Sequence, residues 1–254
     1  MSEHSFDREH PSVSSFEKHP YLWAISVGWA YFFAHQLSFF FPDAERILMA
    51  IWPASGIGLA ALLLSPRRRW PGILITLFIA GNIANLISGR PFAGSIGFMT
   101  ANVLESYGCA WLLTRFLGAA VSFSRIRDIM TLLFAMAVVN SCTASIGAVT
   151  AHVIGDAPFW QFWKTWWIAD GLGILLITPF IVSWAQHWRN RFPIKWPRLL
   201  EQVLFLSIWS ALTWISFNIV PCPIPPYLLA ALLAWPMFRF GTTGTTIALV
   251  VLTG

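Results

Sequence analysis

The feature that most constrains the fold of this chain is a series of apolar segments, each about as long as a membrane-spanning helix. A helix of roughly 20 apolar residues crosses the hydrocarbon core of a bilayer. The strands of a membrane barrel would instead be segments of about ten residues with alternating polarity. The sequence therefore predicts an all-α fold, a polytopic transmembrane helical bundle of about eight spans. The predicted spans are 21–41, 47–64, 70–88, 92–114, 129–154, 160–185, 199–220 and 227–240.

Composition supports this class. Of the 254 residues, 57% are hydrophobic and 11% are charged, whereas a soluble domain carries about 25% charged residues. The length leaves no room for a separate soluble domain beside the spans. We expect residues 1–20 to be a cytoplasmic amino-terminal tail and residues 21–254 to form one membrane domain.

The basic residues predict the orientation of the chain. Cytoplasmic connections of membrane proteins carry an excess of Lys and Arg. One side of the predicted topology holds twelve: Arg8, Lys18, Arg67, Arg68, Arg69, Arg115, Arg125, Arg127, Arg189, Arg191, Lys195 and Arg198. The other side holds Arg46, Arg90 and Lys164. We therefore expect a multi-pass protein with a cytoplasmic amino terminus. This topology accounts for the net charge of +5 without a nucleic-acid partner.

The second span is predicted to be a broken helix. Proline lacks a backbone donor and is tolerated best in the first helical turn, so a helix restarting at Pro53 would follow an irregular stretch from Met49 to Trp52. Broken membrane helices usually line a buried or wet cavity. A simple proline kink packed against its neighbours is the alternative.

Polar residues of three spans are predicted to meet near the middle of the membrane. At 1.5 Å per residue, Pro53, Asn82 and Asn102 lie roughly 17–18 Å from the cytoplasmic ends of their spans, and Glu105 lies roughly 14 Å deep. Asn82 and Asn85 share a helix face, as do Asn102 and Glu105. An ionisable group at such depth indicates a functional site. Alternatively, a protonated Glu105 only joins helices through Asn82 or Asn102.

A second intramembrane acid, Asp170, follows an aromatic stripe that includes Trp163 and Trp166. An interfacial tryptophan belt explains such a stripe. An outward-facing aromatic cleft leading to a carboxylate is the alternative, and it suits a cationic or amphipathic ligand. A helix that begins near Trp160 would let Asp170 approach Glu105, whereas one that begins near Trp166 would leave it too shallow.

No catalytic constellation is present: the sequence has no Walker loop, no His-Glu-x-x-His and no Gly-x-Ser-x-Gly. We therefore expect no catalytic residue, no metal and no cofactor. Arg239 could pair with an acid or extend to the membrane surface. The candidate ligand-binding residues are Pro53, Ser55, Asn82, Asn85, Asn102, Glu105, Trp163, Trp166, Asp170 and Arg239.

Six motifs follow one another along the chain: Trp52-Pro53-Ala54-Ser55-Gly56-Ile57, Arg69-Trp70-Pro71-Gly72-Ile73, Gly81-Asn82-Ile83-Ala84-Asn85, Asn102-Val103-Leu104-Glu105, Asp170-Gly171-Leu172-Gly173-Ile174-Leu175 and Arg239-Phe240-Gly241. This ordered set resembles the bacterial membrane-associated sensor domain of the first type. The resemblance begins at about Tyr21 and implies an integral input domain that, in longer proteins, precedes histidine kinase, diguanylate cyclase or phosphodiesterase modules.

We therefore predict a bacterial inner-membrane sensor, not itself an enzyme, that detects a small ligand or a membrane state. The predicted partners are membrane lipid, an unidentified small molecule and a cytoplasmic output module for two-component or cyclic-di-GMP signalling; a homodimer stays open. The sequence stops inside an apolar run after Arg239, so we expect a longer protein in which such a module follows. The alternatives are a secondary transporter or proton-coupled permease with a midplane carboxylate site, and a non-catalytic scaffold.

Overall fold

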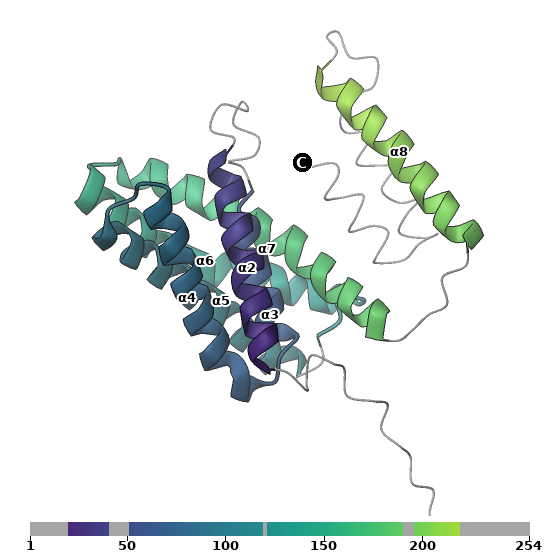
Figure 1. Ribbon diagram of the computed structural model, residues 1–254, viewed down its shortest axis with the longest axis horizontal. Coiled ribbons are helices and arrows are strands. Elements are labelled where there is room, and N and C mark those ends of the chain that lie inside the picture. Colours follow the sequence, from purple (N-terminus) through teal and green to yellow (C-terminus); the bar gives the residue numbers. More distant parts are fainter. Residues whose placement is uncertain (1–19, 41–50, 119–120, 190–195, 219–254) are drawn as a thin grey trace, which may run out of the picture.

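The computed structural model describes residues 20–40, 51–118, 121–189 and 196–218, and all regular structure within these residues is helical. Figure 1 shows α2 to α7 gathered in one bundle, with α8 to one side. The all-α prediction is confirmed for these residues. The elements are α2 (Pro20–Phe40), α3 (Pro53–Leu63), the short 3₁₀ helix η2 (Arg67–Arg69), α4 (Trp70–Ile87), α5 (Phe92–Leu117), α6 (Ile126–Gly155), α7 (Phe159–Arg189) and α8 (Trp196–Asn218).

Proline and glycine set several helix ends, as their backbone preferences require. Pro53 occupies the first turn of α3 and Trp52 precedes it in a non-helical conformation. Gly89 (φ 78°) shapes the turn between α4 and α5, and Gly118 (φ 84°) follows the end of α5. Residues 41–50, where the other half of the broken second span was expected, lie outside the described residues. That the second helix is broken therefore stays a prediction.

Three of the described helical segments can cross a membrane by length and composition: Arg67–Ile87, Ile126–Gly155 and Phe159–Gln186. Two shorter apolar helices, Pro53–Leu63 and Leu200–Leu212, accompany them. The predicted eighth span, 227–240, lies outside the described residues. The structure thus supports a membrane protein with several apolar helices, and the count of eight stays a prediction.

The bundle has an apolar exterior and a partly polar interior, the arrangement that a lipid surrounding favours. On α4, Ile75, Ile79 and Ile83 recur one turn apart and are exposed, while Leu77 on another face is buried. Polar side chains lie among the buried residues of the neighbouring helices. They include Ser55, Asn82, Asn85, Asn102, Glu105, Asn140, Thr143 and Asp170.

Helices α3 and α7 approach each other closely at two glycines, Gly56 and Gly173. A methyl group at Gly173 would overlap the carbonyl oxygen of Trp52, and one at Gly56 would overlap the carbonyl oxygen of Gly173. The Trp52 amide donates a hydrogen bond to the Ala169 carbonyl at 2.9 Å, and Thr178 Oγ1 donates to the Gly56 carbonyl at 3.1 Å. These contacts fix the beginning of α3 against the middle of α7.

Candidate functional site

The two intramembrane acids meet in the interior of the bundle. Glu105 on α5 is 1% exposed and Asp170 on α7 is 4% exposed. Their carboxyl groups lie close enough to interact with each other, and the Ser55 hydroxyl of α3 lies near both, although no hydrogen bond joins it to either. Helix α7 begins at Phe159, so Asp170 lies about three turns inside it. The deeper of the two predicted positions of Asp170 is therefore the observed one.

The hydrogen-bond partner of Glu105 is a residue that was not predicted. Thr143 Oγ1 of α6 donates to Glu105 Oε1 at 3.4 Å. The other carboxylate oxygen, Oε2, is buried without a hydrogen-bond partner among the described residues. Three residues before Thr143, Asn140 Nδ2 donates to the Trp167 carbonyl of α7 at 2.8 Å. Glu105 thus touches polar groups of α3, α6 and α7.

Asn82, one of the amides considered as partners of Glu105, has other hydrogen-bond partners. Ser95 Oγ donates to Asn82 Oδ1 at 2.6 Å, and Asn82 Nδ2 donates to the Phe78 carbonyl at 2.8 Å. The bond from Ser95 fastens α4 to α5 near their connecting turn, and the bond to Phe78 lies within α4. The reason is the direction of the side chain about the helix axis. Similar depth in the membrane places Asn82 near the height of Glu105, but the Asn82 side chain does not point toward Glu105.

Next to the acid pair lies a partly open cavity of about 150 Å³. Its lining comes from α2, the residue before α3, the end of α4 with the following turn, α5 and α7. The aromatic lining residues are Trp52, Phe98, Phe162 and Trp166. The other lining residues are His35, Ser38, Asn85, Arg90, Asn102, Thr165, Ala169 and Asp170.

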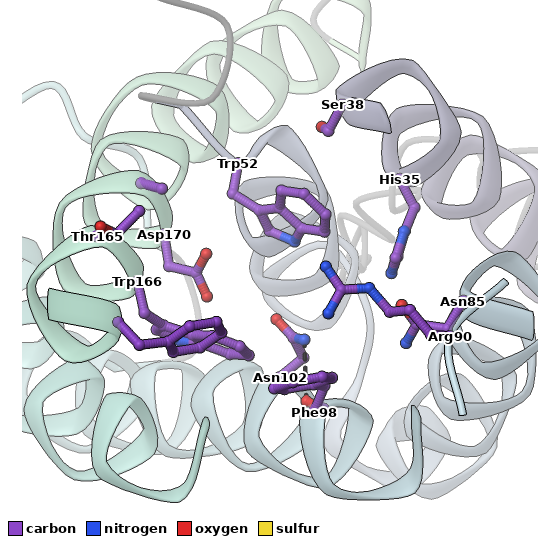
Figure 2. A pocket seen from close by; sticks show the side chains of 12 residues that line it. His35, Ser38, Trp52, Asn85, Arg90, Phe98, Asn102, Thr165, Trp166 and Asp170 are labelled. Atoms are coloured by element: carbon purple, nitrogen blue, oxygen red, sulfur yellow. Dashed lines mark hydrogen bonds between the residues drawn. The ribbon is translucent and has the colours of Figure 1, made fainter. Parts of the chain in front are cut away.

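A cation and a carboxyl group face this cavity from different helices. Figure 2 shows the Asp170 carboxyl and the Arg90 guanidinium on opposite sides, both directed inward, with Trp52 between them. Arg90 is half-buried and lies 4.9 Å from the ring centroid of Phe98. Its backbone amide donates to the Asn85 carbonyl at 3.0 Å. Burial lowers the pKa of the Arg90 guanidinium, and the same loss of solvent strengthens its interaction with an anion.

Several polar atoms of the cavity lining are buried without a hydrogen-bond partner among the described residues. They are Asn85 Nδ2, Asn102 Oδ1, Trp166 Nε1 and Asp170 Oδ2. Asn102 Nδ2 donates to the Phe98 carbonyl at 3.0 Å, which leaves its oxygen as the acceptor. Buried polar atoms in native proteins are nearly always hydrogen-bonded. A small polar molecule or water in the cavity would supply the hydrogen-bond partners that these four atoms need.

The aromatic stripe of α7 is divided between two surfaces. Trp166 lines the cavity together with Phe162 and stacks near Phe98. Trp163 and Trp167 instead face α6: Trp163 Nε1 donates to Ser145 Oγ at 3.1 Å, and Trp167 Nε1 donates to Ser141 Oγ at 3.1 Å. Trp163 therefore packs between helices, and only part of the stripe forms the predicted cleft.

Apart from Asn82 and Trp163, the candidates fall into four groups. Asn85, Asn102, Trp166 and Asp170 line the cavity, and Ser55 and Glu105 lie behind it with the acid pair. Pro53 starts α3 beside the lining residue Trp52 but is not itself part of the lining. Arg239 lies outside the described residues.

Sequence reasoning missed Arg90, His35 and Trp52 as lining residues. Arg90 was assigned to a turn, yet a basic residue five positions after a predicted site residue, Asn85, was a usable signal. Thr143 could also have been found, because Asn140 and Thr143 are spaced i, i+3 within an apolar span. Among the described residues, no group of three or more His, Cys, Asp or Glu side chains could hold a metal ion.

Comparison with known proteins bears on this arrangement. The sequence profile of the family described as MASE1 matches residues 21–254. A curated protein of Escherichia coli (strain K12), described as probable diguanylate cyclase DgcE, is 25% identical over 222 residues. That alignment covers 87% of this chain and 20% of the relative, so the chain spans about a fifth of the relative's length. No significant match to a solved structure was found.

Proposed function

Because the chain belongs to the MASE1 family of membrane-associated sensor domains, we propose that it detects a small ligand in the cavity beside Asp170 and relays occupancy to a carboxy-terminal output module. The description of the relative as a probable diguanylate cyclase favours a module that makes cyclic di-GMP. Family membership favours sensing over the transporter alternative. We further propose a location in the bacterial cytoplasmic membrane.

One observation carries this proposal: the cavity ends on a carboxyl group that lies on the longest described helix and touches a second buried acid. A ligand that contacts Asp170 changes the charge balance and the hydrogen bonding of the Asp170–Glu105 pair. Both acids connect different helices, so a change at the pair alters the relative stability of helix arrangements. A ligand shifts such an equilibrium by its differential affinity for the two arrangements.

Helix α7 provides a route for the signal. It carries the lining residues Phe162 and Asp170 near its beginning and continues to Arg189. Pro179 lies inside it, and proline removes a helical hydrogen bond and favours a bend. We propose that α7 moves at this point when the cavity is occupied.

The proposed orientation places the cavity toward the outside of the cell, because Arg90 and the beginning of α7 belong to the side with few basic residues. A cysteine introduced at Arg191 is expected to resist a membrane-impermeant thiol reagent added to intact cells. A cysteine introduced at Gly155, an exposed position at the end of α6, is expected to react. The parent chain with its own cysteines measures the background, and labelling of Arg191→Cys from outside would contradict the orientation.

The coupling of cavity to output can be tested without knowing the ligand. Thr165 lines the cavity and is exposed, so Thr165→Trp should fill the cavity without overpacking the core. We expect this variant, in a protein that carries a diguanylate cyclase module after residue 254, to shift cyclic di-GMP formation at least about fivefold, the lower end of typical allosteric couplings. Cellular cyclic di-GMP is measured at matched protein levels.

Ile168→Trp is the matched control, since Ile168 is exposed on the same helix and does not line the cavity. It adds a similar ring to the lipid-facing surface and should leave output unchanged. The proposal fails if both variants insert normally and both keep the output of the parent.

A further inference from the structure

Apart from Trp166 Nε1, a donor on α7, the polar groups named below are separated by type. Donors come from the end of α4 and its turn: the Arg90 guanidinium and Asn85 Nδ2. Acceptors come from α5 and α7: Asn102 Oδ1 and Asp170 Oδ2. Figure 2 shows Arg90 and Asn85 together on one side and Asp170 on the other. A ligand that contacts all four groups needs an acceptor at one end and a donor at the other.

The charges of the two sides make this requirement stricter. A simple organic cation next to Asp170 would also face the Arg90 guanidinium, and a simple anion next to Arg90 would leave the Asp170 and Asn102 oxygens without a donor. Like charges in a partly desolvated site repel strongly. A molecule with both charges meets the opposite charge at each end.

The volume of the cavity and its aromatic lining limit the size and the apolar part of the ligand. At roughly 10–15 Å³ for each water-sized group, a cavity of about 150 Å³ holds on the order of ten such groups. It is smaller than the pockets of about 300–1,000 Å³ that take drug-sized ligands. The rings of Phe98, Phe162 and Trp166 provide apolar contacts and ring faces that attract an ammonium group.

We propose that the cavity binds a small zwitterion of the amino-acid type, with its carboxylate on Arg90 and Asn85 and its ammonium group on Asp170 and Asn102. The inference rests on the proposed sensor function and specifies its ligand class. Glu105 supports the ammonium end through its contact with Asp170, and Trp166 Nε1 adds a donor beside the apolar part of the ligand.

Binding is tested on the purified chain in detergent or nanodiscs, through the thermal midpoint and a titration. The probes are each of the twenty common amino acids and glycine betaine, followed by the deaminated and decarboxylated analogues of the strongest binder. We expect at least one zwitterion to bind saturably, and its two analogues to bind at least tenfold more weakly. The inference is overturned if no zwitterion binds, or if an analogue with a single charge binds as tightly.

Variants assign the two ends of the ligand. Arg90→Gln and Asp170→Asn should each weaken binding of the zwitterion at least tenfold, and Arg90→Lys should weaken it less than Arg90→Gln. Lys164→Gln removes an exposed charge from the same helix as Asp170 without touching the cavity lining, and it should bind like the parent. Unchanged binding in both Arg90→Gln and Asp170→Asn would overturn the assignment. If a variant does not fold, binding of the deaminated and decarboxylated analogues to the parent chain still tests whether the ligand must be a zwitterion.

Failure of this inference is distinguishable from failure of the proposed function. If Thr165→Trp changes output but no zwitterion binds, the sensor function stands and the ligand class is wrong. If a zwitterion binds but neither it nor Thr165→Trp changes output, the binding site stands and the sensor function is wrong.

Discussion

Replacing Gly173 with alanine is expected to lower the thermal midpoint of the purified chain by about 2–12 °C. The added methyl group would overlap the Trp52 carbonyl oxygen, and because this neighbour is backbone, α3 and α7 must separate. Separation weakens the hydrogen bonds from Trp52 to Ala169 and from Thr178 to Gly56. Overpacking of this kind costs about 1–3 kcal/mol, and each kcal/mol corresponds to about 2–4 °C in a domain of this size.

Gly72→Ala provides the matched control. Gly72 lies in α4 with no atom within 4 Å of the position of an added methyl group, and alanine favours a helix over glycine by about 1 kcal/mol. This variant should therefore keep or slightly raise the midpoint. Midpoints are read from the fraction that remains monodisperse in size-exclusion chromatography after heating in detergent. Equal midpoints for Gly173→Ala and Gly72→Ala would contradict the close packing of α3 on α7.

Removing the Glu105 side chain is expected to uncouple the cavity from the output module. Glu105 accepts a hydrogen bond from Thr143 of α6 and lies near Asp170 of α7 and Ser55 of α3. Glu105→Ala therefore removes polar contacts of α5 with three helices at once. In this background, the expected fivefold effect of Thr165→Trp should fall below about twofold. The difference between the two backgrounds is a double-mutant cycle for the coupling of the two positions. Cyclic di-GMP formation is the readout.

Two further variants show whether the effect of Glu105→Ala comes from lost ionisation or from lost contact. Glu105→Gln keeps the shape and the hydrogen bonding but cannot ionise, so a preserved Thr165→Trp effect in this background indicates that contact alone transmits the signal. A lost effect indicates that ionisation is needed. Leu104→Ala truncates the neighbouring, exposed side chain and should leave the coupling intact. If Glu105→Ala retains the full Thr165→Trp effect with normal membrane insertion, Glu105 only joins helices and is not part of the signal route.

The predicted positions of the candidate residues were more accurate than their predicted contacts. Depth along each helix placed Asn102 and Glu105 near one level, because rise per residue is the same in every α-helix. It left two positions open for Asp170, which depended on where the helix begins. Depth carries no information on rotation about the helix axis. For that reason Asn82, one of two amides considered as partners of Glu105, bonds Ser95, and Trp163, a candidate ligand-binding residue, bonds α6.

The residues that were missed belong to segments that are distant in the chain. Thr143 reaches Glu105 across 38 positions, and the Trp52 amide reaches the Ala169 carbonyl from the residue before another helix. Arg90 enters the cavity from a turn that requires the positive φ of Gly89. Its guanidinium lies over the ring of Phe98. Neither spacing nor composition can report such contacts.

Membrane class, helix type and most helix bounds thus followed from composition and spacing, since hydrocarbon makes demands that each segment meets locally: sufficient length, apolar side chains and internally bonded backbone groups. Which polar side chains share a cavity depended on tertiary structure. The close approach of α3 and α7 at Gly56 and Gly173 sets the position of Trp52 against Asp170. It is a property of two packed surfaces, and the sequence of either helix alone does not contain it.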